Sequence, residues 1–187
     1  MGFYPISLDI KDKLCVVIGN GSVGAGKAKA LLEAGAKVKI IERPYKKGDL
    51  DGAFLAIAAT DNEEVNVKVA EDAKKLGILL NVVDKPAISN FYNASVVKRG
   101  DLVISISTGG KFPALSKKLR KEFSRRLGPE YEEYLEVLAK ARNKVIAKYA
   151  DLNKRKAKLE QIARLPLIEL IKRGKAEEAK EKVSSCI

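Results

Sequence analysis

The sequence contains no histidine, and only two of its 187 residues are cysteine. Histidine is the usual acid–base side chain near neutral pH and the commonest metal ligand, so catalysis here falls to carboxylates, hydroxyls or a bound cofactor. Cys15 and Cys186 stand at opposite ends of the chain without metal-ligand spacing. This cysteine usage excludes a disulfide framework and favours a reducing cytoplasm, and we expect no metal site.

Long apolar runs are missing as well. No stretch of 18 or more apolar residues occurs, so the sequence predicts no membrane-spanning helix and no membrane partner. Residues 1–6 do not form a basic region followed by an apolar stretch, and we expect no signal peptide.

The chain does have an excess of positive charge, with 36 Lys and Arg against 24 Asp and Glu and a net charge of +12. Its 46% hydrophobic content excludes a wholly disordered chain. Residues 1–113 hold 16 basic and 13 acidic side chains, whereas residues 114–187 hold 20 and 11. A basic surface attracts nucleic acid, anionic membranes or polycarboxylate molecules, and composition alone does not choose among them.

Apolar strand patterns alternate with helix patterns in the first part of the chain, which predicts an α/β fold with a Rossmann-like, mostly parallel sheet. After Pro113 only helical spacing remains. We therefore predict a nucleotide-binding domain over residues 1–112 and a helical dimerisation and substrate-cleft region over residues 113–187. The expected strands are 14–18, 38–41, 53–59, 78–83 and 103–107, and the expected helices include 25–34 and a segment from Asp61 to about Leu76.

A glycine-rich motif, G-x-G-x-x-G, follows the first predicted strand and opens the first predicted helix. In this context Gly19 permits a tight turn, Gly21 lets a pyrophosphate approach the backbone, and Gly24 allows close packing of helix on strand. The helix N-terminus adds unpaired N–H groups that bind phosphate. The motif predicts dinucleotide binding by Gly19, Asn20, Gly21, Ser22, Val23 and Gly24.

Glu42 stands at the end of the second strand, about where dinucleotide-binding folds carry an acidic residue for the ribose hydroxyls. A carboxylate there favours NAD over NADP, because it repels a 2′-phosphate. An arginine near this place, as the adjacent Arg43 is, can accommodate the 2′-phosphate of NADP. A solvated Glu–Arg pair at the end of a strand explains the dipeptide equally well.

Polar residues also follow other predicted strands, and ligands bind beyond the carboxyl ends of parallel strands. Thr60 and Asp61 end one strand and are expected to bind the cofactor, although Asp61 also suits a helix cap. Asp84 follows another strand and precedes Lys85-Pro86, which places it at the rim of the sheet.

These segments together resemble those of the precorrin-2 dehydrogenase family, which occurs alone or as the N-terminal part of siroheme synthase. The resemblance covers nearly the whole chain. It rests on Phe3–Ile6, the glycine loop with Lys27, residues 49–54, Ala59–Asn62, Asn81–Pro86 and Ile106–Pro113, in the family's order.

The resemblance implies NAD-dependent oxidation of precorrin-2 to sirohydrochlorin in siroheme biosynthesis, on a homodimer formed largely through the region after the nucleotide-binding fold. It implies that Asp84 is the catalytic acid–base and that Thr108 lies in the cleft. We expect Thr108, Gly109, Gly110 and Lys111 to bind the substrate, with Lys111 as a basic partner for its carboxylates. That substrate carries eight carboxylates, which the chain's basic side chains would attract. Some family members also insert Fe²⁺ or Co²⁺ into the product.

The chain departs from the family between its second and third strands, where it is shorter by about 20 residues. If Glu42 matches the end of the missing stretch, it is not the ribose partner, and the choice between NAD and NADP stays open. Gly26 stands where the family often has arginine, and Asn93 replaces a common proline.

The leading interpretation is a dehydrogenase without chelatase activity, and three alternatives to it remain. The enzyme could be bifunctional and also chelate metal, or it could be another Rossmann oxidoreductase. It could also be a nucleotide-sensing protein whose basic helix contacts nucleic acid, although no helix-turn-helix or stacking-aromatic motif supports this.

Overall fold

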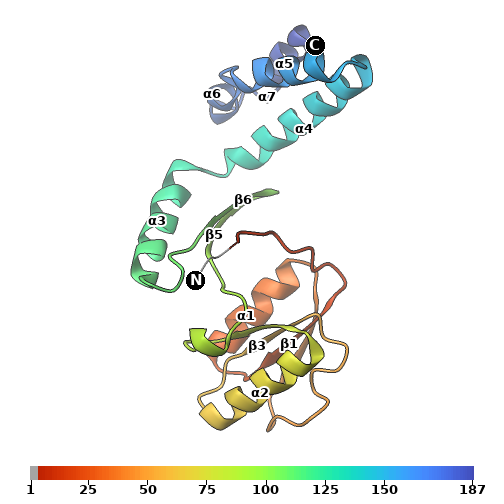
Figure 1. Ribbon diagram of the computed structural model, residues 1–187. Coiled ribbons are helices and arrows are strands. Elements are labelled where there is room, and N and C mark those ends of the chain that lie inside the picture. The colour runs from red at the N-terminus through yellow and green to blue at the C-terminus, as the bar shows by residue number, and fades with distance from the viewer. Residues whose placement is uncertain (1–3) are drawn as a thin grey trace. The chain divides into compact units, whose positions relative to one another are not determined.

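The computed structural model describes residues 4–187, so Phe3 of the Phe3–Ile6 motif lies outside the described residues. The chain forms two compact units (Figure 1). The first unit runs to Asn93 and takes in Gly109–Lys111, and the second comprises Ala94–Thr108 and Phe112–Ile187. The sequence predicted that the boundary between the two domains lies after residue 112.

The first unit contains four parallel strands in the order β2-β1-β3-β4. The chain passes from β1 to β2 on one side and then crosses to β3 on the other. The predicted Rossmann-like, mostly parallel sheet is confirmed. The elements of this unit are β1 (Leu14–Ile18), α1 (Ser22–Glu33), β2 (Lys37–Ile41), β3 (Leu55–Ala58), α2 (Glu63–Leu76), β4 (Leu79–Val82) and the 3-10 helix η1 (Pro86–Ile88).

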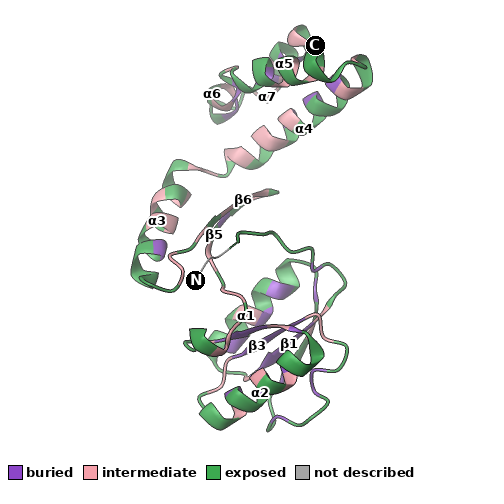
Figure 2. Ribbon diagram, in the orientation of Figure 1, coloured by how far each residue is buried: buried purple, intermediate pink, exposed green. Residues whose placement is uncertain are grey.

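Both faces of the sheet are buried at β1, β3 and β4, as is typical of a parallel sheet, whereas the edge strand β2 is largely exposed. Alternate residues of β1 point to opposite faces: Cys15 and Val17 pack with Ala28 and Leu31 of α1, whereas Val16 and Ile18 pack with α2. Figure 2 shows β1 and β3 as the buried centre of the unit and much of the surface of α1 and α2 as exposed. The sheet is therefore rigidly held from both sides, and its strand ends provide fixed positions.

Helix α2 has a complete set of end signals. Its N-cap is Asn62, whose side chain accepts a hydrogen bond from the backbone N–H of Val65, and Gly77 ends it in the left-handed conformation. Asp61, which the sequence offered as the cap, precedes the cap and is exposed. Its carboxylate is thereby left for another role.

The fifth predicted strand, residues 103–107, does not join the parallel sheet. The outer edge of β4 is already occupied, because Asn90 accepts from the Leu80 N–H (2.7 Å) and donates to the Ile78 carbonyl (3.1 Å). Ser89 accepts from the Val82 N–H (2.9 Å). These side chains satisfy backbone groups that a fifth strand would need.

The strand residues that follow instead form an antiparallel pair in the second unit, β5 (Ser95–Arg99) with β6 (Leu102–Ile106). The pair turns at Gly100, which has a positive φ of 56°. One face of the pair is inward, with Val97 buried, while Val96 and Val103 on the other face are exposed.

The helices of the second unit confirm the helical region predicted from the sequence. Its largest apolar cluster joins Val145 of α4 to Ile162, Leu167 and Ala179 on the helices that follow. The helices are α3 (Pro113–Arg126), α4 (Glu130–Lys148), α5 (Leu152–Ala163), α6 (Leu167–Lys172) and α7 (Ala176–Cys186).

The connection from β2 to β3, residues 42–54, contains no helix or strand. Tyr45 and Leu50 from this connection are buried against the α2 face of the sheet. The Tyr45 hydroxyl donates to the carboxylate of Asp72 on α2 at 3.0 Å, and this contact adds to burial in raising the pKa of Tyr45. This connection therefore packs as part of the core.

We expect Leu167→Ala to destabilise the second unit by about 2–5 kcal/mol, because Leu167 is fully buried and its truncation leaves a cavity. Urea unfolding followed by circular dichroism measures this change. Leu152→Ala is the control, since Leu152 is 74% exposed and its truncation should cost no more than about 0.5 kcal/mol. Equal effects of the two substitutions would contradict the packing described.

Candidate functional site

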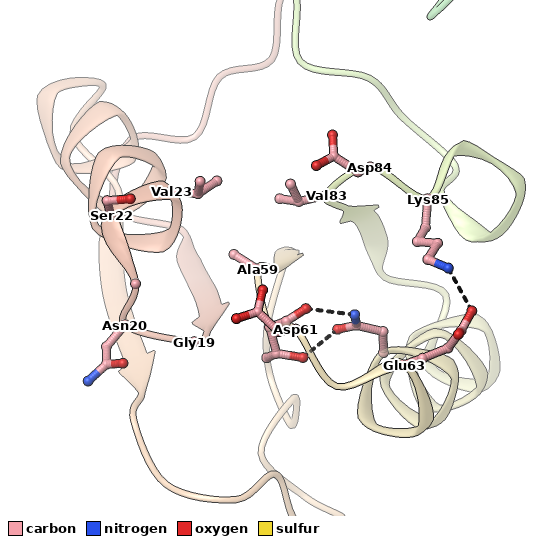
Figure 3. Close-up of a pocket in the computed structure, with 13 residues that line it drawn as sticks. Gly19, Asn20, Ser22, Val23, Ala59, Asp61, Glu63, Val83, Asp84 and Lys85 are labelled. Carbon is pink, nitrogen blue, oxygen red and sulfur yellow. Dashed lines mark hydrogen bonds and ion pairs between the residues drawn. The ribbon is translucent and has the colours of Figure 1, made fainter.

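A cavity of about 640 Å³ opens where the carboxyl ends of β1, β3 and β4 meet. This is the switch point of the sheet, where the connections leave β1 in opposite directions and where open α/β sheets bind their ligands. The volume suits a ligand of nucleotide size. The cavity is lined by Gly19–Val23, by Ala59–Asp61 with Glu63 and Asn66, and by Val83–Lys85 (Figure 3).

Two of the three motif glycines are required by close backbone contacts. A Cβ at Gly19, whose φ is +102°, would lie 2.4 Å from the carbonyl oxygen of Ala59. A Cβ at Gly24 would lie 2.2 Å from the carbonyl oxygen of Gly19. The turn, the helix and β3 therefore meet at distances that only glycine permits.

Gly21 differs, because a Cβ there would meet nothing within 4 Å and would instead project into open space. Gly21 is the N-cap of α1, and it offers no side-chain cap. The first turn of α1 contains no acidic residue, in contrast to α2, which carries Glu63 and Glu64. The start of α1 thus has the N–H groups and partial positive charge that bind an anion such as a pyrophosphate.

The loop after β3 is held by a reciprocal pair of hydrogen bonds. The Thr60 hydroxyl donates to the side-chain oxygen of Asn66 at 2.8 Å, and the Asn66 amide donates to the Thr60 carbonyl at 2.9 Å. Asn66 is only 4% exposed, so this pair fixes the wall of the cavity. Asp61 follows on this wall, exposed and lining the cavity.

Asp84 lies where β4 ends and has the left-handed backbone conformation, with φ of 59°. This conformation is uncommon for a residue with a side chain, though aspartate tolerates it better than most. The preceding Val83 continues the sheet by donating from its N–H to the Ala58 carbonyl at 2.9 Å. In Figure 3 Val23 and Val83 point toward one another, and Asp84 lies at the end of this pair. Asp84 therefore has an exposed carboxylate, and the backbone just before it is held by the sheet.

Two lysines modify the charge around Asp84. Lys85 forms a 2.6 Å ion pair with Glu63 across the cavity wall, and this hydrogen bond lowers the pKa of Glu63. Burial lowers the pKa of Lys27 on α1, and the charge of Asp84 acts in the opposite direction. Asp84 thus lies within the electrostatic reach of a half-buried lysine.

The structure brings together most of the predicted cofactor residues. Gly19–Val23, Thr60 and Asp61 line one cavity together with Asp84, and Gly24 is buried and does not line it. Glu42 follows β2 but is not among the lining residues. Ala59, Glu63, Asn66, Val83 and Lys85 also line the cavity and were not among the predicted site residues.

The predicted substrate residues lie outside this cavity. Gly109–Lys111 belong to the first unit, where a Cβ at Gly110 would lie 4.0 Å from the Tyr92 ring. Thr108 belongs to the second unit, and its hydroxyl accepts from the Phe112 N–H at 3.2 Å. Within residues 4–187, no three Asp, Glu or Cys side chains gather as a metal site, and no helix is long and apolar enough to span a membrane.

The sheet order, the switch-point cavity and the glycine-defined helix start make the first unit a Rossmann-like dinucleotide-binding domain. Residues 6–95 match the protein family described as "Putative NAD(P)-binding", which supports a nicotinamide cofactor.

The chain is 32% identical over 200 residues to siroheme synthase of Vesicomyosocius okutanii, and the match covers 96% of this chain and 43% of that protein. Siroheme synthase of Nitrosospira multiformis is also 32% identical, over 204 residues, with the same shares. A solved structure titled "SirC, precorrin-2 dehydrogenase" matches with a TM-score of 0.76, 21% identity, and coverage of 98% of this chain and 100% of that one.

The chain is therefore a homologue of the siroheme synthases, and the family resemblance found in the sequence is confirmed. It spans about two fifths of the length of these curated relatives. The solved structure confirms the fold over both units.

We expect Gly24→Ala to weaken nicotinamide-dinucleotide binding at least tenfold, because the new Cβ would displace the Gly19 carbonyl, and to cost about 1–3 kcal/mol of stability. Gly26→Ala is the matched control, since a Cβ at Gly26 meets nothing within 4 Å and alanine stabilises a helix by about 1 kcal/mol. Thermal melting with and without NAD⁺ measures both effects. Tight binding by Gly24→Ala would contradict the described packing.

Proposed function

We propose that the chain catalyses the NAD-dependent oxidation of precorrin-2 to sirohydrochlorin, a step of siroheme biosynthesis. The observation that carries the proposal is the carboxylate of Asp84 at the rim of a dinucleotide-sized cavity, beside the glycine loop. The names of its siroheme synthase homologues support the substrate. The free thiols of Cys15 and Cys186 suit the cytoplasm that we propose as its location.

The residues present fit a nicotinamide dinucleotide. The open space at Gly21 and the uncapped start of α1 would hold the pyrophosphate, and Thr60 and Asp61 would flank a ribose. Bound NAD⁺ would supply the hydride acceptor for the oxidation. We propose NAD rather than NADP because an acidic residue, Glu42, follows β2.

Asp84 would take the proton that precorrin-2 loses when a hydride leaves the macrocycle. The substrate thereby loses two hydrogens, one as the hydride that NAD⁺ would accept and one as the proton that Asp84 takes. The carboxylate then passes its proton to water, which reaches it because the side chain is exposed. The support for this role is positional, since the hydrogen-bonded edge of β4 keeps the backbone at Asp84 fixed.

The substrate's carboxylates call for basic side chains. We propose that Lys111, next to Gly109 and Gly110, contacts a carboxylate, and that Thr108 donates a hydrogen bond to the substrate. Both Lys111 and the nearby loop are exposed to solvent or partly so. Lys85 is less available for this role, because it is paired with Glu63.

We expect Asp84→Asn to lower kcat by about 10²–10⁴-fold with little change in the affinity for NAD⁺, because a general base contributes that factor. NADH absorbance after addition of precorrin-2 measures the rate. Asp12→Asn is the matched control, since Asp12 is the other non-glycine residue with a positive φ among those described, at 60°, and does not line the cavity. A turnover in Asp84→Asn close to that of Asp12→Asn would remove Asp84 from the mechanism.

We also propose that the protein is a homodimer and that the outer face of β5 and β6 contributes to the contact. Val96 and Val103 on that face are 45% and 49% exposed. Among residues 4–187, β5 and β6 pair only with each other and with no third strand, and a two-stranded sheet is marginal by itself. A second copy covering this face would bury both valines.

We expect Val103→Glu to weaken self-association at least tenfold, because a charge in an apolar contact is strongly disfavoured. Sedimentation equilibrium measures the association constant. Val67→Glu on α2, where the valine is 42% exposed, is the control and should leave the association constant unchanged. A monomeric wild-type protein, or equal association of both variants, would refute this interface.

A further inference from the structure

Arg43 stands at the place in the fold where charge decides between NAD and NADP. Ile41, the last residue of β2, pairs with Ile18, and its carbonyl accepts from the Gly19 N–H at 3.0 Å. The two residues that follow therefore start beside the glycine loop, where dinucleotide-binding domains recognise the ribose hydroxyls or the 2′-phosphate. Glu42 and Arg43 have opposite preferences between these groups.

The guanidinium of Arg43 is engaged elsewhere. It makes a bidentate contact with the carboxylate of Asp49, with Nη1 and Nη2 donating at 2.9 and 2.7 Å. Nη1 also donates to the Pro44 carbonyl at 3.0 Å. Three hydrogen bonds thus hold a group whose fork geometry suits a carboxylate and a phosphate equally well.

Asp49 is a fixed partner for this arginine. It is 5% exposed, and it also accepts from the backbone N–H of Lys46 at 2.8 Å. The Lys39 ammonium lies 4.0 Å from the same carboxylate. The hydrogen bond from Lys46 and the burial of the adjacent Leu50 hold Asp49 in place. The position of the Arg43 side chain is therefore set by Asp49.

Glu42 is exposed, and no ion pair among the described residues includes it. A carboxylate left unneutralised in this position accepts hydrogen bonds from ribose hydroxyls and repels a dianionic phosphate.

We propose that Asp49 determines cofactor preference by holding Arg43 away from the adenosine ribose, which leaves Glu42 to select NAD over NADP. This inference rests on the proposed function of the cavity as a nicotinamide-dinucleotide site. It makes the specificity determinant a residue of the β2–β3 connection that need not touch the cofactor.

The ionisation of the pair is consistent with this role. The hydrogen bond from Arg43 lowers the pKa of the Asp49 carboxyl, against an opposing effect of burial. Because this pKa is lowered, the charged pair is stable at and above the ordinary pKa of a carboxyl group. It is lost only as the pH falls through the lowered value, and is therefore intact at neutral pH.

The experiment is calorimetric titration of the purified full chain with NAD⁺ and with NADP⁺, in the wild type and four variants. The wild type should bind NAD⁺ at least tenfold more tightly. Asp49→Asn removes the charge that holds Arg43, so NADP⁺ affinity should rise about tenfold, the effect of one charge-assisted contact, while NAD⁺ affinity changes less than about threefold.

Three further variants separate this effect from a general loosening of the connection. Arg43→Ala should leave NADP⁺ affinity within about twofold of wild type, because the arginine does not reach the phosphate there. The double variant Arg43→Ala/Asp49→Asn should lack the gain in NADP⁺ affinity expected of Asp49→Asn alone. Glu42→Gln should narrow the preference by raising NADP⁺ affinity.

An NADP⁺ affinity that falls tenfold in Arg43→Ala would falsify the inference, since Arg43 would then already contact the phosphate. Equal binding of both nucleotides by the wild type would overturn it too. If Asp49→Asn does not fold, Arg43→Ala and Glu42→Gln decide the matter, because both alter exposed side chains. Failure of the wild type to bind either nucleotide would refute the proposed cofactor site itself, a result distinct from binding without preference.

Discussion

The functional site depends on the close approach of three backbones at the carboxyl end of β1. The carbonyl oxygen of Gly19 lies where a side chain at position 24 would be, and the carbonyl of Ala59 lies where one at position 19 would be. This contact sets the start of α1 against both β1 and β3, and so determines where the unpaired N–H groups of the helix point. The cavity and its position relative to the end of β4 follow from two positions, 19 and 24, at which no Cβ can be accommodated.

Much of this site could be predicted from the sequence, because the signals for it are local. The β-branched run Leu14–Ile18 followed by spaced glycines specifies strand, turn and helix within about a dozen residues, and the structure has these elements. Asp84 could be placed at the sheet rim for the same reason, since it ends an apolar strand. The sequence offered Asp61 as a possible helix cap, whereas the cap is the next residue. Asp61 and Asn62 have similar capping propensity, and only the geometry shows that Asn62 accepts from Val65.

What could not be predicted depends on contacts distant in sequence. The strand at 102–106 has an ordinary strand composition, but whether it joins the parallel sheet is decided by Ser89 and Asn90 on the edge of β4. Asn66 is a polar residue inside a helix, and its pairing with Thr60 is visible only when both elements are assembled. Arg43 next to Glu42 could be interpreted in two ways until the position of Asp49 was known. Propensity describes a residue's own backbone, whereas these outcomes depend on which neighbour reaches a given group first.

The side chains that cover β4 also bear on how the protein behaves at high concentration. A bare edge strand exposes a row of N–H and C=O groups to which a strand of another molecule can add, and such addition is a common start of aggregation. The Asn90 side chain accepts from the Leu80 N–H of β4 and donates to the carbonyl of Ile78 just before the strand. Ser89 accepts from the Val82 N–H, and the Asn90 N–H donates to the Leu80 carbonyl. The segment that fixes the rim next to Asp84 therefore also protects the sheet from templated growth, so that Ser89 and Asn90 serve both the solubility of the protein and the geometry of the cavity rim.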